Sequence, residues 1–121
     1  MIRHHYIIRI ELKDIDQIYP KPDYTNDIYY SLHHEMSNAN FESVIRNHQI
    51  RKDYFLPRAM YRLDSELPIN EITNIVKQVI YSAFENFNCE GGIEKHYSVI
   101  TIGAGNYHFH NLDPVPNDDG N

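Results

Sequence analysis

A stripe of apolar residues with helical spacing, over residues 72–87, is the feature that most constrains the fold of this chain. Its members are Ile72, Ile75, Val76, Val79, Ile80, Ala83, Phe84 and Phe87. Asn70 is predicted to cap the helix that they form. Burial of the seven side chains larger than alanine would contribute on the order of 10 to 20 kcal/mol in gross terms. We therefore interpret this helix as hydrophobic core and not as a functional site.

Three segments before this helix are predicted as β-strands. Residues 5–13 alternate, with Tyr6, Ile8, Ile10 and Leu12 on one face. Segments 41–48 and 58–63 are the predicted second and third strands, joined by a polar connection through residues 51–57. In the third strand, Ala59, Tyr61 and Leu63 are expected to face the helices, which leaves Arg58, Met60 and Arg62 on the open face.

A second helix and two later strands complete the predicted fold. Thr25 can cap a helix with the stripe Ile28, Leu32 and Met36, ending at residues 38–40. Residues 96–102 form a β-branched run, and segment 107–112 is expected to return as a short extra strand. This order predicts an α+β, ferredoxin-like βαββαβ domain over residues 1–112, with both helices on one face of an antiparallel sheet. Residues 113–121 are expected to form a flexible tail.

Charge is distributed unevenly along the chain. The net charge is −6, which argues against a general electrostatic affinity for nucleic acids. Residues 41–63, however, have a local balance of +3, since Arg46, Arg51, Lys52, Arg58 and Arg62 outnumber Glu42 and Asp53. The first and third strands are neighbours in the predicted sheet, so Arg9, Arg58 and Arg62 should meet His5, Ile7 and Met60 on its open face. This patch is interpreted as an RNA-binding surface, as a homodimer interface or as an ordinary solvated face.

Several residues are candidates for chemistry on RNA. The predicted RNA-binding residues are Arg9, Arg51, Lys52, Arg58 and Arg62. His48 is a candidate base for a ribose 2′-hydroxyl, with Arg46 or Arg51 as the cation for the phosphate. Alternatively, Asp14 and Asp16 are candidates to hold a divalent cation. His108 and His110 are expected on one face of a strand, but two ligands do not make a metal site, and no resident cofactor is predicted.

Other sequence features bear on the compartment. No apolar run approaches the roughly 18 residues of a membrane span, and residues 1–6 lack the pattern of a secretory signal. Cys89 is the only cysteine, which agrees with a reducing compartment. The sequence therefore predicts a cytoplasmic protein without a membrane partner.

Residues 36–45, with the sequence Met-Ser-Asn-Ala-Asn-Phe-Glu-Ser-Val-Ile, resemble the GhoS-type antitoxins, as do Leu56-Pro57, Tyr61, Ser65 and Glu71-Ile72. The resemblance covers about sixty residues. It implies a ferredoxin-like fold related to the small CRISPR-associated adaptation nuclease, and an endoribonuclease that cleaves the messenger RNA of its partner toxin. It also implies RNA contact for Arg46, which follows the Phe-x-Ser-x-Ile element. The chain departs from that family in a longer loop at residues 17–24 and an extension at residues 108–121.

Two functional hypotheses follow from the sequence. The first is a small endoribonuclease or RNA-binding antitoxin that acts on single-stranded RNA with little or no dependence on metal. The second is a non-catalytic antitoxin or inhibitor from a mobile element, which binds a protein through the open sheet face. Its basis is the acidic net charge and the lack of a complete catalytic constellation in the sequence.

Overall fold

The computed structural model describes residues 2–14, 24–85 and 92–116. Its elements are β1 (His4–Leu12), α2 (Tyr24–Asn38), β2 (Val44–Asn47), β3 (Lys52–Phe55), β4 (Met60–Ser65), α3 (Ile69–Phe84), the 3-10 helix η1 (Glu94–His96), β5 (Tyr97–Gly103) and β6 (Asn106–His110). Asp16, Phe87, Cys89 and the side chain of Thr25 lie outside the described residues, so the predictions that rest on them have no structural counterpart.

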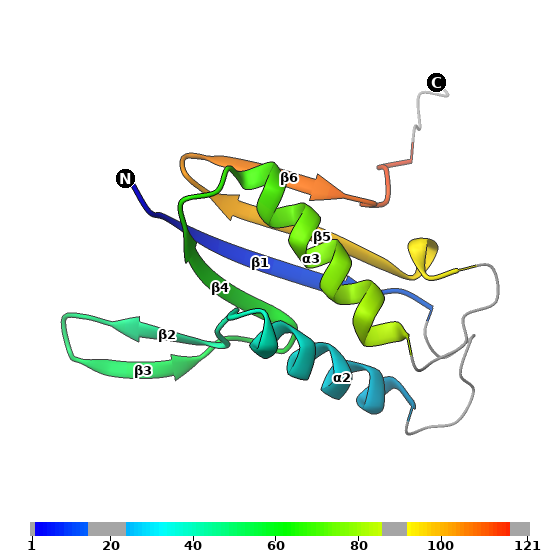
Figure 1. The fold of residues 1–121 in the computed structure, drawn as a ribbon, viewed down its shortest axis with the longest axis horizontal. Helices are drawn as coiled ribbons and strands as arrows, with labels where there is room; N and C mark the ends of the chain where they lie inside the picture. The colour runs from blue at the N-terminus through cyan, green and yellow to red at the C-terminus, as the bar shows by residue number, and fades with distance from the viewer. Residues whose placement is uncertain (1, 15–23, 86–91, 117–121) are drawn as a thin grey trace.

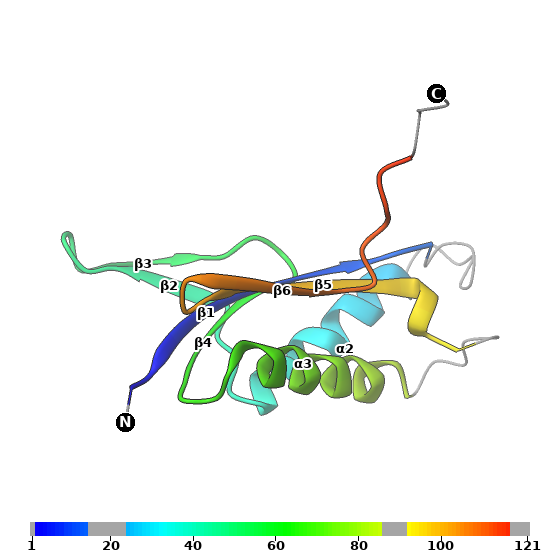
Figure 2. The ribbon, with the colours of Figure 1, turned by 90° about the horizontal axis from the view of Figure 1, so that it is seen from above.

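Four strands form an antiparallel sheet in the order β4-β1-β5-β6. Figures 1 and 2 show both helices on one face of this sheet and the opposite face without a helix. The predicted α+β class is confirmed. In the ferredoxin-like pattern the first strand lies between the third and the last, and β1 lies between β4 and β5 in this way. The predicted extra strand is β6, which adds to the outer edge of β5.

The predicted second strand does not join the main sheet, and this part of the prediction is wrong. Val44–Asn47 instead pairs with Lys52–Phe55, in a hairpin that extends beyond the end of the sheet (Figure 1). The segment predicted as a polar connection is therefore partly a strand. All four residues of β3 are exposed, so the alternation of burial that identifies a half-buried strand is missing there. One bridge, between Glu42 and Arg62, links this region to β4.

The core lies between the helices and the inner face of the sheet. Tyr6, Ile8 and Ile10 of β1 are buried, as the alternation predicts, and so is the stripe Ile28, Leu32 and Met36 of α2. In α3 the described members of the predicted stripe are buried, except Ile75, which packs at the edge of the core: Ile72, Val76, Val79, Ile80, Ala83 and Phe84. The helix stripes were thus sufficient to locate the core.

The start of α3 differs from the prediction. The N-cap is Pro68 and no side chain caps the helix, so the assignment of Asn70 as cap is wrong. Proline fixes φ near the value that a helix entry requires and has no N–H to satisfy, which makes it compatible with this position. The predicted end of α2 is confirmed, because Asn40 has a φ of 70° and the N–H of Phe41 donates to the carbonyl of Met36.

Gly103, at the end of β5, is packed directly against β1. A Cβ atom there would lie 2.5 Å from Cδ1 of Tyr6 and closer still to the carbonyl oxygen of His5. We expect Gly103→Ala to lower the free energy of unfolding by about 3 kcal/mol, because the backbone of β1 must shift. Urea denaturation measures this cost. Gly105→Ala is the control, since Gly105 also has a positive φ but has open space around it, and its expected cost is about 1 kcal/mol. Equal costs for both variants would contradict the prediction.

Candidate functional site

A cleft of about 380 Å³ lies between the hairpin and the end of the main sheet. The residues that line it are His5, Tyr6 and Ile7 of β1, Ile45 and Arg46 of β2, His48 in the hairpin turn, and Arg62 and Asp64 of β4. These residues come from three separate parts of the sequence. The cleft brings together the predicted catalytic residues Arg46 and His48 with the predicted RNA-binding residue Arg62.

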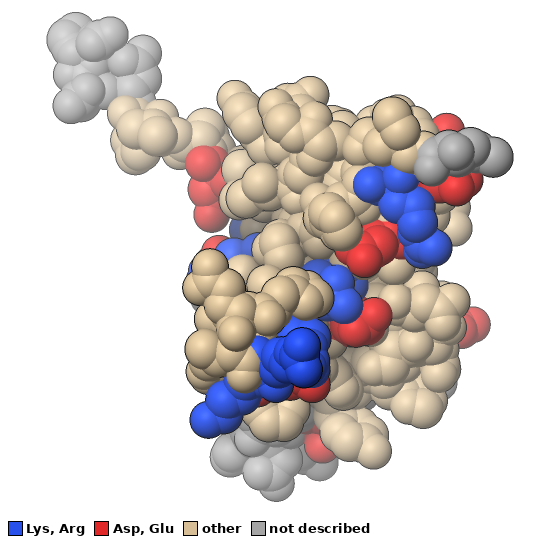
Figure 3. Space-filling view, turned by 90° about the vertical axis from the view of Figure 1, so that its left-hand side faces the viewer, with Lys and Arg blue, Asp and Glu red and all other residues tan. Residues whose placement is uncertain are grey.

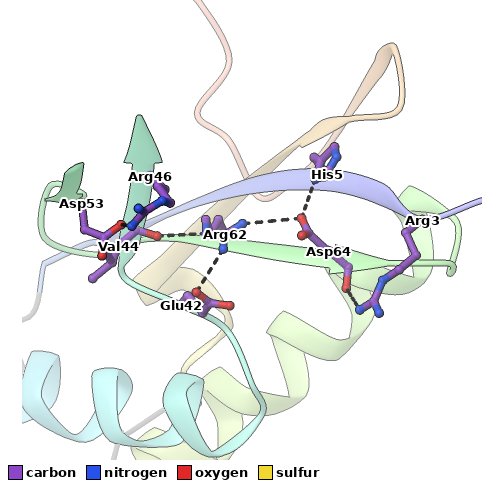
Figure 4. A network of polar contacts seen from close by, with 8 residues as sticks. All are labelled: Arg3, His5, Glu42, Val44, Arg46, Asp53, Arg62 and Asp64. Atoms are coloured by element: carbon purple, nitrogen blue, oxygen red, sulfur yellow. Dashed lines mark hydrogen bonds and ion pairs between the residues drawn. The ribbon is translucent and has the colours of Figure 1, made fainter. Parts of the chain in front are cut away.

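Arg62 connects the hairpin to the sheet (Figure 4). Its Nε donates to the carbonyl oxygen of Val44 at 2.9 Å, and Nη2 donates to Oε2 of Glu42 at 3.1 Å. Nη1 lies 3.6 Å from Oδ1 of Asp64, which is the adjacent acid on the same face of β4. Because the guanidinium contacts acceptors in three directions, we assign Arg62 a positioning role at the floor of the cleft.

His5 and Asp64 form a pair across β1 and β4, where they are directly opposite in register. Nδ1 of His5 lies 2.6 Å from Oδ1 of Asp64. The hydrogen bond from His5 lowers the pKa of the Asp64 carboxyl, with a further contribution from the charges of Arg62 and Arg3 against the effect of desolvation. The ionised carboxylate is only an acceptor, so His5 Nδ1 carries the proton and Nε2 is left for another partner.

Arg46 forms an ion pair with Asp53 across the hairpin, with Nη1 3.1 Å from Oδ1. Both side chains are largely exposed, at 43% and 57%, so the pair contributes about 1 kcal/mol or less. Figure 3 views the molecule from the hairpin end and shows Lys and Arg interleaved with Asp and Glu there. The arginines at the cleft are thus accompanied by carboxylates, and a phosphate would have to compete with Asp53 for Arg46.

Arg58 lies away from this cleft. Its guanidinium carbon is 4.0 Å from the centre of the Tyr29 ring of α2, in a second cavity of about 500 Å³ that His33 and Tyr61 also line. The predicted position of Arg58 on the open face is therefore wrong. The physical reason is the positive φ of Ala59, 63°, which interrupts the strand alternation just before β4 begins. Burial raises the pKa of Tyr61 in this cavity to about 12.

The remaining predicted residues are dispersed. Arg51 and Lys52 lie at the hairpin turn, and Arg9 is exposed in the middle of β1. Asp14 follows the opposite end of β1, which is separated from His5 by roughly 23 Å of extended strand. Nowhere among the described residues do three or more His, Cys, Asp or Glu side chains gather as a metal site requires.

His108 and His110 face the helix side of β6, in register with buried Thr101 and Val99. His110 is hydrogen-bonded to Glu94, which also accepts from the hydroxyls of Tyr81 and Tyr97. The hydrogen bond from Tyr81, followed by those from His110 and Tyr97, lowers the pKa of the Glu94 carboxyl against the effect of desolvation. The cluster holds η1 and β6 against α3 and β5, so its role is structural.

Asp64 is the residue of the cleft that sequence reasoning missed. Its pairing with His5 depends on the register between β1 and β4, and these residues are 59 positions apart. Ile45 was named only as part of a strand and of the Phe-x-Ser-x-Ile element, although it lines the cleft together with the arginines. No local pattern in the sequence marks either residue as part of a site.

Comparison of the chain with protein-family models found no match. Comparisons with curated proteins and with solved structures also found none. The resemblance to the GhoS-type antitoxins therefore stays a prediction. In the described residues, no helix combines the length and the apolar character needed to cross a bilayer.

Proposed function

We propose that this protein is a small endoribonuclease that cleaves single-stranded RNA at the cleft between β1, β4 and the hairpin, without a metal ion. The observation that carries the proposal is that two imidazoles, His5 and His48, line the same cleft as Arg46 and the His5 partner Asp64. Cleavage of RNA through its own 2′-hydroxyl requires one proton acceptor, one proton donor and a cation for the phosphate.

The reaction assigns one role to each group. His48 accepts the proton of the 2′-hydroxyl as O2′ attacks the phosphorus atom, and the bond from phosphorus to O5′ breaks. His5 enters the step as the imidazolium, with its Nδ1–H held by Asp64. It donates the Nε2 proton to the leaving O5′, which gives a 2′,3′-cyclic phosphate, a free 5′-hydroxyl and a neutral His5. Asp64 fixes the tautomer and the orientation of the His5 ring, as a carboxylate does for the histidine of a hydrolytic triad.

Arg46 is the cation best placed for the phosphate. Its partner Asp53 is exposed, so exchanging that carboxylate for a bidentate phosphate costs little. Arg62 keeps the cleft in shape and is retained by Glu42, Asp64 and Val44. The GhoS-type resemblance supports the same assignment, because it implies RNA contact for Arg46. With a messenger RNA as substrate, we propose a cytoplasmic location as well.

A second candidate function is a non-catalytic antitoxin or inhibitor that binds a protein, including a second copy of the chain. The observation in its favour is that both arginines of the cleft already have carboxylate partners. Binding would then use the open face of the sheet and would be insensitive to salt, whereas RNA binding through arginines weakens as salt rises.

The test is cleavage of an end-labelled, unstructured RNA by the purified protein in the presence of EDTA. We expect cleavage to continue without metal and to yield 2′,3′-cyclic phosphate ends, while a duplex of the same sequence stays intact. A preparation of the His48→Ala variant, purified in parallel, controls for contaminating ribonuclease. Intact RNA with and without Mg²⁺ or Mn²⁺, or cleavage that EDTA abolishes, would overturn the proposal.

A further inference from the structure

The open face of the main sheet carries two rows of residues that run across the strands. The register places Tyr107, Ile102, Ile7 and Arg62 in one row. The same register places Phe109, Ile100, Arg9 and Met60 in the next row. Each row therefore begins with an aromatic residue on the edge strand β6 and reaches an arginine on β1 or β4.

The two aromatic side chains are exposed and parallel. Tyr107 is 66% exposed and Phe109 52%, and their ring centres are 6.4 Å apart with an angle of 12° between the planes. Beside them is a hollow of about 560 Å³, lined by Ile100, Ile102 and Leu112, with Gly103 and Gly105 at its end. Both helices lie on the other face of the sheet (Figure 2), so they do not cover these rings.

We propose that Tyr107 and Phe109 form a stacking platform on β6 for the bases of single-stranded RNA. The RNA runs from the cleft across β1 and β5 to this platform. The inference rests on the proposed function and adds where the substrate lies outside the cleft. Aromatic rings on an open sheet stack bases without regard to sequence, since every base has a flat π face. The hollow beside the rings gives a base apolar surroundings.

The spacing of the rows suits such a strand. Neighbouring strands are about 4.8 Å apart, so Phe109 lies roughly 10 Å from the Arg9 position and Tyr107 roughly 14 Å from the Arg62 position at the cleft. A few nucleotides of extended RNA cover this distance. Arg9 is exposed, and no ion pair involves it within the described part of the chain, so it can contact a phosphate between the platform and the cleft.

The arginines favour RNA over a second copy of the chain as the partner that binds the open face of the sheet. The centre of a dimer interface is depleted of charged residues, whereas both rows contain an arginine within three strands of the aromatic ring. A guanidinium that lies within a few nucleotides of exposed aromatic rings can bind a phosphate of the same single strand whose bases stack on the rings. The face therefore fits RNA better than it fits its own copy.

The experiment measures the Kd of fluorescent oligouridylate by anisotropy, together with the single-turnover cleavage rate at saturating RNA. We expect Tyr107→Ala and Phe109→Ala each to raise Kd about tenfold and the double variant about 100-fold. The cleavage rate at saturation should change by less than about twofold, because the platform does not touch the reacting atoms. Tyr107→Phe should bind as the wild type does. Tyr30→Ala, on α2 and 77% exposed, is the control, and thermal melts verify that each variant is folded.

The outcomes separate this inference from the proposed function. If the wild-type protein binds RNA without cleaving it, and the platform variants weaken binding, the endoribonuclease assignment fails and the platform stands. If the wild type cleaves RNA and the platform variants bind as tightly as it does, the platform is overturned and the proposed function stands. Platform variants that only convert a dimer to a monomer in sedimentation would assign this face to a second copy and overturn the inference.

Discussion

Replacing His48 by alanine is expected to lower the single-turnover rate of RNA cleavage by about 10²- to 10⁴-fold, the usual contribution of a general base. His48 is exposed in the turn between β2 and β3, so the substitution removes no core packing and the melting temperature should stay unchanged. RNA affinity should also change little, because Arg46 and not His48 carries the charge that contacts the phosphate. A loss of rate without a loss of binding is the signature of an interaction made in the transition state.

The control for this variant is His34→Ala. His34 is an exposed histidine of α2, on the face of the molecule opposite the open side of the sheet, so its removal should leave the rate unchanged. Wild-type activity in the His48→Ala variant would show that the cleft does not act as assigned.

Asp64→Asn is a second, independent test of the roles assigned to the residues of the cleft. The amide keeps the shape of the side chain but can also donate, so it no longer fixes the tautomer of His5. The pKa of Asp64 lies below its ordinary value, so in the wild type the carboxylate stays ionised across the neutral range. A rate loss in this variant, smaller than that of His5→Ala and with an altered pH profile, identifies Asp64 as a positioning residue.

Local periodicity identified most of the fold. The alternation in β1 and the stripes of α2 and α3 each reflect one buried face, and burial follows the predicted positions Tyr6, Ile28 and Ile80. The same logic failed at the hairpin, because β3 buries no side chain and its strand pairing is a backbone property. The side chain of Asn47 accepts from the N–H groups of the turn, a local signal that could have revealed the hairpin.

The candidate site could be predicted only in part from the sequence. Arg46 and His48 could be selected as chemically suitable residues near each other in the chain. Their meeting with His5 and Asp64 depends on how β1 pairs with β4 and on how Arg62 attaches the hairpin. These are long-range contacts that no local pattern encodes. The prediction for Arg58 was wrong for a local reason. The positive φ of the next residue, Ala59, interrupts the strand alternation, so the Arg58 side chain lies on the Tyr29 ring and not on the open face.

The position of the cleft also explains why the protein holds its hairpin outside the sheet. A strand paired along the whole of β4 would replace the hairpin, which supplies Ile45, Arg46 and His48 to the cleft. The single bridge between Glu42 and Arg62 instead anchors the hairpin at one end and leaves a gap beside β1. The departure from the expected topology is therefore what creates the candidate site.

Phe84→Ala is expected to lower the free energy of unfolding by about 3 to 5 kcal/mol, the range for removing a buried phenylalanine side chain. Phe84 is 2% exposed near the end of α3 and belongs to the core cluster that includes β1 and β5. A domain of this size is stable by about 5 to 15 kcal/mol, so this one change removes a large share of the total. At this chain length the melting temperature should fall by roughly 12 to 20 °C.

Phe55→Ala provides the matched comparison, because it is the same chemical change at a side chain that is 88% exposed. Its expected cost is about 0.5 kcal/mol or less, since β3 packs against nothing that buries it. Urea denaturation of both variants measures the difference, and similar slopes show that both unfold in one transition. Equal destabilisation by the two substitutions would mean that the hairpin is an integral part of the core. The cleft would then not be an opening between an anchored hairpin and the sheet, and the assignment of His48 and His5 to one reactive site would have to be abandoned.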